Sequence, residues 1–363
     1  MKRSRPKAGF AENHFNLLVL LGVFLSFFIA GGSEALAQAG KAADLEQAAK
    51  KEARLRMVVF PSVRPAAEAF EKKYGIKVEG TYVGDPDILR KVSTESQAGV
   101  FATDIFTTSP GPTGSELNKW TTAYTPTGFE KVAEVKKALP ADWNQIPMFN
   151  HVVGVLYHRD LVPPKQVPTS IYDLLKPEFK GKIISRTPWL GSNFLVGILS
   201  YFTWFDRDMN KWQDYWTRFR GNVGRYEAGF PTLHFAVGLK EFSMAVFTLT
   251  YTSSLWGGTY PGIAFSTFKE GGIWWPNMVA IHKNTPHPNG AKLFVNYLVS
   301  EEGQRIFADG GNLPASKSVP AKAEIKDALQ GIKLFNGNLQ PTLVKELDER
   351  EEEWKSRLQK IFQ

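Results

Sequence analysis

Cysteine is absent from the 363 residues of this sequence. A disulfide bond and a lipid anchor on an N-terminal cysteine are therefore both excluded, and oxidising surroundings would neither stabilise nor damage the chain. The rest of the composition is ordinary for a globular protein, with 43% hydrophobic and 22% charged residues. The length allows two domains or one large domain.

Short catalytic motifs are absent as well. The sequence has no nucleophile elbow, no P-loop, no HExxH zinc motif and no Rossmann glycine fingerprint. No carboxylate pair stands out for acid–base chemistry, and no two of the six histidines are four residues apart: His14, His151, His158, His234, His282 and His287. We therefore expect no enzyme, no metal site and no cofactor, although a catalytic site built from distant residues stays open.

Positive charge is in excess but dispersed. The formal net charge is +8, yet no run of five or more basic residues occurs. The basic patch typical of nucleic-acid-binding proteins is thus missing, and we expect no nucleic-acid partner.

The N-terminus has the three parts of a secretory signal peptide in their usual order. Basic residues within Lys2–Lys7 precede the apolar run Leu17–Ala30, and the small-residue site Ala35–Ala37 follows. The apolar run is shorter than the roughly 20 residues that span a bilayer. We expect cleavage near Gln38, which lowers the formal charge to +6. No other segment is long and apolar enough to span a membrane, so the mature protein should be soluble.

The mature chain opens with a strand–helix–strand pattern. Met57–Phe60 is a continuous apolar run, as in a buried parallel strand. Ala66–Lys73 reads as a helix, and Ile76–Tyr82 alternates like a second strand. This βαβ unit predicts a right-handed crossover and a parallel sheet in an α/β protein.

A second α/β unit lies near the other end of the chain. Met278–Ile281 is a short apolar strand, and the helix after it carries an apolar face formed by Leu293, Phe294, Tyr297 and Leu298. Ser300 can cap the next helix. Further expected elements are a leading helix, a core helix with Trp212 on its apolar face, a loop and a terminal helix: Lys41–Arg56, Lys211–Phe219, Gly224–Pro231 and Leu343–Phe362. The docking face expected on the terminal helix is Leu347, Trp354, Leu358 and Phe362.

Several of these stretches resemble one protein family. The motifs are FEKKYGIKVE after the first strand, TDIF at Thr103–Phe106, VPTSIYDLLKPEFKGKI at Val167–Ile183, and HPNGAKLFVNYLVSEEGQ from His287. Together they resemble bacterial extracellular solute-binding proteins, the periplasmic receptors of ABC importers, in the branch that includes ferric-ion, thiamine, polyamine and phosphonate binders. His158 and Tyr172 stand where that family commonly has Asn and Trp.

The resemblance implies a fold and an organisation. The fold would be the two-lobed periplasmic-binding-protein type II fold, α/β, with a mostly parallel, helix-flanked sheet in each lobe and hinge strands between them. Residues 1–37 would be the signal peptide, 38–150 the first part of lobe 1, 151–262 lobe 2, 263–315 the return to lobe 1, and 316–363 a C-terminal helical segment. The protein would be a periplasmic monomer that captures a small solute and delivers it to an ABC permease in the inner membrane.

Ligands of open α/β sheets bind beyond the carboxyl ends of the strands. Two expected loops there are Pro61–Arg64 and Thr107–Gly111, and Tyr251–Ser254 is a third. The resemblance implies that the loop Arg186–Asn193 faces the ligand from the second lobe. The candidate ligand-binding residues are Ser62, Arg64, Thr108, Ser109, Arg186, Trp189, Ser192, Asn193 and Tyr251. Each has an ordinary alternative: caps and turns for the hydroxyl residues, surface ion pairs for the arginines, and lobe packing for Trp189.

The ligand expected is a small organic anion, because Arg64 and Arg186 can bind carboxylate or phosphate through bidentate hydrogen bonds. Ferric-binding relatives use a pair of adjacent tyrosines, whereas here Tyr251 is followed by Thr252. Iron is the alternative within the family. Alternatives of other classes are a secreted enzyme with a non-local active site and a ligand sensor for a membrane receptor.

Overall fold

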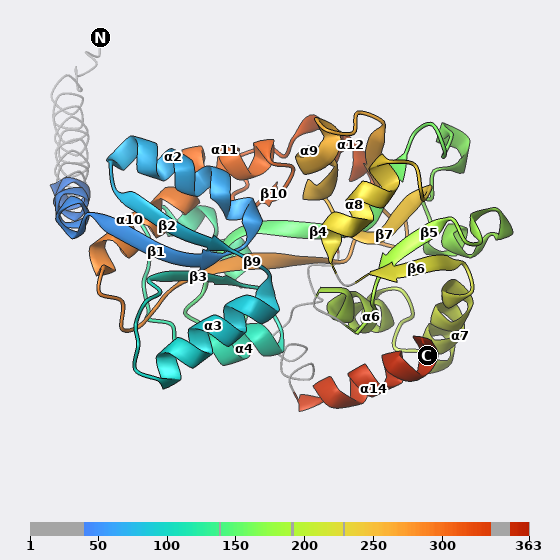
Figure 1. Ribbon diagram of the computed structural model, residues 1–363, viewed down its shortest axis with the longest axis horizontal. Helices are drawn as coiled ribbons and strands as arrows, with labels where there is room; N and C mark the ends of the chain where they lie inside the picture. Colours follow the sequence, from blue (N-terminus) through green and yellow to red (C-terminus); the bar gives the residue numbers. More distant parts are fainter. Residues whose placement is uncertain (1–39, 138, 190–191, 228, 335–348, 363) are drawn as a thin grey trace, which may run out of the picture.

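The computed structural model describes residues 40–137, 139–189, 192–227, 229–334 and 349–362. The predicted signal peptide, Leu343 and Leu347 lie outside the described residues. Two groups of strands and helices, lobe 1 and lobe 2, lie side by side along the long axis of the molecule (Figure 1). None of the described helices is long and apolar enough to cross a membrane.

Lobe 1 begins with the predicted parallel βαβ unit. β1 (Arg54–Val59) pairs in parallel with β2 (Lys77–Tyr82), and α2 (Arg64–Tyr74) connects them. β3 (Ile105–Thr108) pairs in parallel with the other edge of β1. The leading helix is shorter than expected, because the chain is helical over residues 40–52 and then joins the ladder with β2.

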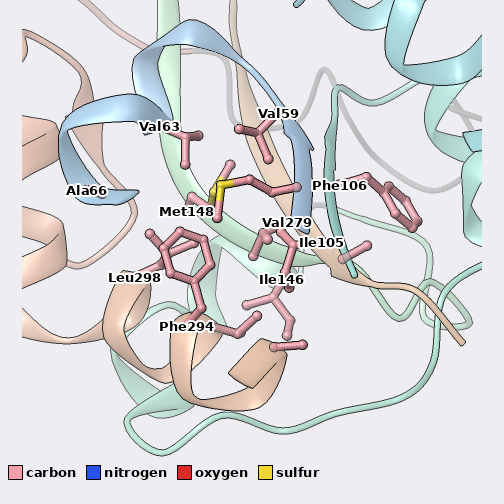
Figure 2. Packing of buried hydrophobic residues seen from close by; sticks show 14 of the residues in the cluster. Val59, Val63, Ala66, Ile105, Phe106, Ile146, Met148, Val279, Phe294 and Leu298 are labelled. Atoms are coloured by element: carbon pink, nitrogen blue, oxygen red, sulfur yellow. The ribbon is translucent and has the colours of Figure 1, made fainter. Parts of the chain in front are cut away.

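Helices cover both faces of this sheet (Figure 1). They are α3 (Asp85–Gln97), α4 (Pro112–Asn118), α5 (Ala133–Lys136), α10 (Pro288–Val299) and α11 (Glu301–Asp309), with the short turns η1 (Pro61–Val63) and η2 (Phe129–Lys131). The expected apolar face of α10 is buried, and Figure 2 shows Phe294 and Leu298 beside Val59, Ile146 and Val279. Ser300 caps α11 as predicted by accepting a hydrogen bond from the Gly303 amide.

Two long strands cross between the lobes. β4 (Ile146–His158) pairs through Ile146–Val152 with β9 (Trp274–Ile281) and through Val153–His158 with strands of lobe 2. All of these pairings are antiparallel, and the short β10 (Leu313–Pro314) is a fourth antiparallel neighbour of β4, after β9 and two strands of lobe 2. The outer strands of each lobe are therefore parallel, while the crossing strands make the sheet mixed.

Lobe 2 contains its own parallel strands. β5 (Ile183–Arg186) pairs in parallel with β6 (Val223–Glu227) and with β7 (Met244–Leu249), while β8 (Ile263–Ser266) pairs with β4. The prediction of a loop at Gly224–Pro231 is wrong for residues 224–227, which belong to β6. Sequence patterns miss this edge strand because Gly224 interrupts it and because the strand residues, which are not fully buried, form no apolar run.

The helices of lobe 2 pack on both sides of these strands (Figure 1). They are α6 (Ser192–Thr203), α7 (Met209–Arg220), α8 (Phe230–Gly238), α9 (Tyr251–Gly257), α12 (Ala323–Ala328) and α14 (Glu351–Phe362), with η3 (Pro164–Gln166), η4 (Ile171–Leu175) and η5 (Pro177–Phe179). The expected polar loop Tyr251–Ser254 is instead the first turn of α9. The Thr252 hydroxyl donates to the Leu249 carbonyl at 2.7 Å and the Ser253 hydroxyl to the Thr250 carbonyl, whereas the Ser254 hydroxyl donates to Glu324 of α12.

The C-terminal helix completes the core of lobe 2. Trp354, Leu358 and Phe362 of α14 are buried against α6 and α7, which confirms the part of the predicted docking face that is described. Trp354 meets Trp212 edge-on, with ring centroids 5.6 Å apart.

Candidate functional site

The direction of the strands defines where the lobes present their loops. β4 runs from lobe 1 into lobe 2, and the ladders make β1, β2 and β3 parallel to it and β5, β6 and β7 antiparallel to it. The carboxyl ends of the lobe 1 strands therefore point towards lobe 2, and those of lobe 2 point back (Figure 1). We call the region between these ends the interlobe site. It is the place where α/β folds bind ligands.

The end of β3 is tied tightly into lobe 1. Thr107 and Thr108 belong to the strand and not to the loop after it. Thr107 Oγ1 accepts a hydrogen bond from the Phe60 amide at 2.9 Å, and the buried Thr108 hydroxyl donates to the Ser109 carbonyl at 3.1 Å. The Thr108 hydroxyl thus bonds to the local backbone, which is the ordinary alternative role given for the hydroxyl candidates. Ser109 is the first residue after β3.

An aspartate lies beside Ser109. The Ser109 amide donates a hydrogen bond of 3.2 Å to Oδ1 of Asp85, the first residue of α3 after β2. Burial raises the pKa of Asp85 to about 6, while the hydrogen bonds from Ser109 and the charge of Arg186 oppose that rise. Asp85 is absent from the candidate residues of the sequence. Its position after a strand could have revealed it, because the same reasoning singled out the end of β3.

Ser62 and Arg64 follow β1. Ser62 is partly buried in η1, and Arg64 is the exposed first residue of α2. The Arg64 guanidinium lies 4.2 Å from the centre of the Tyr82 ring, at the end of β2. This cation–π contact places the charge of Arg64 at the same end of the lobe 1 sheet.

Lobe 2 contributes Arg186 as the last residue of β5. The partly buried guanidinium lies 4.3 Å from the centre of the Phe230 ring, at the start of α8. Burial lowers the pKa of Arg186, and the charges of Tyr251 and Asp85 act in the opposite direction. Arg186 is therefore within electrostatic reach of a residue from each lobe.

Tyr251 begins α9 directly after β7 and its connecting Thr250. Burial raises its pKa to about 12, against the opposing charge of Arg186, so the phenol is protonated at neutral pH. The ring centroid of His151, in the crossing strand β4, is 5.0 Å away. His151 sits inside an apolar run and gave no signal as a site residue. Burial lowers its pKa to about 3, which keeps it neutral.

The remaining candidates lie after β5. Trp189 is partly exposed and packs against the hydrophobic cluster of lobe 2. This contact corresponds to the alternative role of lobe packing given for Trp189 in the sequence analysis. Ser192 and Asn193 are the first residues of α6, and their side chains lie outside what the structure describes. Of the candidates, Ser109, Arg186 and Tyr251 thus follow or end strands whose carboxyl ends face the other lobe, and Asp85 and Phe230 contact Ser109 and Arg186 there.

Within the described residues, no group of three or more His, Asp or Glu side chains is arranged to hold a metal ion. The described residues at these strand ends include the carboxylate of Asp85 and the phenol of Tyr251. The chemistry that it displays most clearly is a cation stacked on an aromatic ring, an arrangement suited to a bound anion.

Two lobes, crossing strands and facing strand ends define a periplasmic-binding-protein type II fold. A substrate-binding protein of an ABC transporter from Agrobacterium tumefaciens has a TM-score of 0.70 at 14% identity, covering 85% of this chain and 94% of that one. Iron-bound HitA from Pseudomonas aeruginosa has a TM-score of 0.65 at 20% identity, covering 85% and 99%. AfuA from Actinobacillus pleuropneumoniae, with fructose-6-phosphate bound, has a TM-score of 0.67 at 19% identity, covering 84% and 98%.

Residues 65–330 match the family model of bacterial extracellular solute-binding proteins. The match covers most of the chain, and the chain therefore belongs to this family, as its motifs indicate. By family it is a bacterial extracellular solute-binding protein. A search of curated proteins finds no match to the sequence.

Proposed function

We propose that this protein is a periplasmic receptor that binds a small organic anion in the interlobe site and delivers it to an ABC permease. The observation that carries the proposal is the position of Arg186. Its partly buried guanidinium stacks on Phe230 at the end of β5, next to the protonated phenol of Tyr251. Charge-assisted hydrogen bonds from Arg to carboxylate or phosphate are among the strongest polar contacts in proteins.

The other candidate residues have supporting roles in this proposal. The Ser109 hydroxyl and Tyr251 would hydrogen-bond the ligand from the two lobes, and Arg64 would add positive charge at the rim. Ser62, Thr108, Ser192 and Asn193 remain candidates for further hydrogen bonds, and Trp189 for an apolar wall. Binding would shift an equilibrium between open and closed arrangements of the lobes about β4 and β9, and the closed form would dock to the permease.

The fold accommodates more than one kind of ligand. AfuA binds a sugar phosphate, and HitA binds iron. A hard ferric ion needs several anionic oxygen ligands, and burial keeps the phenol of Tyr251 in its neutral form. An organic anion therefore suits the described residues better than ferric ion does.

A thermal-shift screen tests this proposal. The chain from Gln38 would be tested against carboxylates, organic phosphates, phosphonates, polyamines, thiamine and Fe(III), with affinities of the hits measured by calorimetry. We expect an anion to raise Tm and Arg186→Ala to weaken its binding by about 10–100-fold, the usual worth of a hydrogen bond to a charged group. Arg218→Ala is the control, because Arg218 is exposed on α7 and paired with Asp214.

Stabilisation by Fe(III) alone, with a tyrosinate charge-transfer colour, would overturn the anion proposal. Turnover of the stabilising compound by the purified protein would favour the secreted enzyme. Periplasmic location and a monomeric state are checked by cell fractionation, by the mass of the mature N-terminus near Gln38, and by light scattering.

A further inference from the structure

β7 contains one residue more than the part of β4 that it pairs with, beside it in Figure 1. Val155 of β4 pairs with Val246 of β7, but the neighbouring Gly154 pairs with Thr248. Phe247 is therefore the extra residue of a β-bulge. Its backbone φ is 56°, in the left-handed region that a bulky side chain rarely adopts. Such a conformation persists only where the surrounding structure holds it in place.

The bulge changes which residues of β7 face the hydrophobic cluster of lobe 2. Before the bulge, Met244 and Val246 belong to this cluster, whereas Ala245 belongs to a smaller cluster. After the bulge, Leu249 belongs to the cluster of lobe 2. A strand that alternated regularly from Met244 would instead present positions 248 and 250 to it. The extra residue thus moves the inward face of β7 from even to odd positions.

Tyr251 follows the shifted alternation. It packs against the hydrophobic cluster of lobe 2, and its ring centroid is 5.0 Å from that of His151 in β4. His151 shares its face of β4 with Val153, a member of the same cluster. Regular pairing from Met244 onward would bring position 251 opposite Asn150 and direct it to the other face, because a slip of one residue exchanges the two faces of a strand.

Packing on both sides fixes the extra residue at position 247. A Cβ atom on Gly154 would lie 2.1 Å from the Ser266 carbonyl oxygen of β8, so the strand opposite the bulge accepts only glycine there. The Phe247 ring lies in the aromatic core of lobe 2, with its centroid 5.1 Å from those of Trp216 and Phe219. The bulge is therefore held from the neighbouring strand and from the core.

We propose that Phe247 is a positioning residue for Tyr251: its left-handed backbone forms the bulge, and the bulge turns Tyr251 towards His151 and the interlobe site. In the described chain, the ring contacts of Phe247 are with other aromatic residues of the lobe 2 core, so it acts on Tyr251 through the backbone of β7. The effect on the position of Tyr251 needs no ligand, and only its consequence for anion binding rests on the proposed function.

Two isomeric substitutions test this role. Phe247→Leu and Phe247→Ile remove the same ring and add side chains of equal size, but isoleucine branches at Cβ and tolerates the left-handed backbone much less well. Diethyl pyrocarbonate modifies accessible neutral imidazole, and His151, which packs on Tyr251, is 6% exposed. Peptide mass mapping of the ligand-free protein therefore reports whether Tyr251 still covers His151.

The two variants should differ in this labelling. We expect His151 to react in Phe247→Leu within about twofold of its rate in the wild type, and about tenfold faster in Phe247→Ile, the factor that corresponds to the cost of a left-handed residue. Phe219 is the matched control, because it packs on Phe247 from the regular helix α7. Phe219→Leu and Phe219→Ile should label His151 alike.

Urea unfolding gives a second readout, the coupling between positions 247 and 251. Tyr251→Ala should lower the urea midpoint in the Phe247→Leu background as much as it does in the wild type. The loss should be distinctly smaller in the Phe247→Ile background, where Tyr251 no longer packs on His151. A purely structural role of the Phe247 ring would lower the midpoints of both variants without changing this coupling.

Equal labelling and equal coupling in the two Phe247 variants would overturn the proposal. Fast labelling in the Phe219 variants as well would mean a general loosening of lobe 2 and would also overturn it. If Phe247→Ile does not fold, Phe247→Gly and Phe247→Ala decide in its place: glycine adopts the left-handed backbone freely and should protect His151 several-fold better than alanine, and the reverse order would contradict the proposal. Failure of every anion in the screen would overturn the proposed function and leave the result on Phe247 unchanged.

Discussion

The ring centroids of His151 and Tyr251 are 5.0 Å apart. This contact connects the crossing strand β4, which contains His151, to the first turn of α9, which contains Tyr251. His151 also contacts Trp275 of the second crossing strand, with centroids 6.4 Å apart. A residue of the proposed ligand site is thus packed directly on the strands that connect the lobes.

Replacement of Tyr251 by Phe should weaken anion binding by about tenfold. The phenol has a pKa of about 12, so it stays protonated and would donate a hydrogen bond to a bound anion throughout the neutral range, and a donor to a charged acceptor contributes about 1.5–3 kcal/mol. Calorimetry with the best anion of the screen measures the effect. Tyr172→Phe, at an exposed position of lobe 2, is the control and should bind normally. Unchanged affinity in Tyr251→Phe would remove Tyr251 from the site.

His151 should make the folded state less stable in acid. Burial lowers its pKa from 6.5 to about 3. As the pH falls below 6.5, His151 is therefore protonated in the unfolded chain but stays neutral in the folded chain. Linkage gives a loss of about 2 kcal/mol in unfolding free energy between pH 7 and pH 5 from this residue. Urea unfolding at the two pH values measures it, and His151→Gln should lose less stability than the wild type does.

Other groups titrate in the same range, so the comparison with His151→Gln is essential. His234 also has a pKa lowered to about 3 by burial and acts in the same direction. Asp85 acts in the opposite direction, because its pKa is raised to about 6 and the folded state therefore takes up the proton first. Parallel pH profiles for the wild type and His151→Gln would show that His151 is not held neutral.

Local patterns could predict the lobes and half of the site. The βαβ unit, the α10 face and the strand ends that hold Ser109 and Arg186 follow from apolar runs and the turn residues between them. The extent of β3 could not be predicted in this way, because threonines at positions 107 and 108 are also typical of loops. Their place in the strand depends on the pairing with β9, in which both are buried. Polar Tyr251–Ser254 likewise reads as a loop, yet it begins α9, and the Thr252 and Ser253 hydroxyls donate to the carbonyls of Leu249 and Thr250 just before the helix.

The meeting of Asp85 with Arg186 could not be predicted from sequence patterns. The two residues are 101 positions apart in the sequence, and each comes from a different lobe. Their approach depends on long-range packing, which neither spacing nor periodicity encodes. Pro86 stands in the first turn of α3, where its missing amide costs nothing.

Replacement of Asp104 by Asn should strongly destabilise lobe 1. Its fully buried carboxylate accepts hydrogen bonds from the Arg56 amide at 2.7 Å, the Thr285 hydroxyl at 2.7 Å and His287 Nδ1 at 2.9 Å. These contacts join β1, β3 and the turn before α10. Loss of the buried charge should lower the unfolding free energy by about 3 kcal/mol. Asp214→Asn, in an exposed pair on α7, should be close to neutral in the same urea titration.

The C-terminal helix should be required for the stability of lobe 2, although it lies beyond residues 65–330 that match the family model. Trp354 is fully buried, with ring centroids 5.6 Å from Trp212 and 5.3 Å from Tyr201. Trp354→Ala removes a large side chain from a packed core and should lower the unfolding free energy by about 3–5 kcal/mol. Glu352→Ala, whose side chain is 87% exposed on the same helix, is the matched control. Equal urea midpoints for the two variants would mean that α14 adds nothing to the core, whereas the predicted gap would make this helix a structural part of lobe 2.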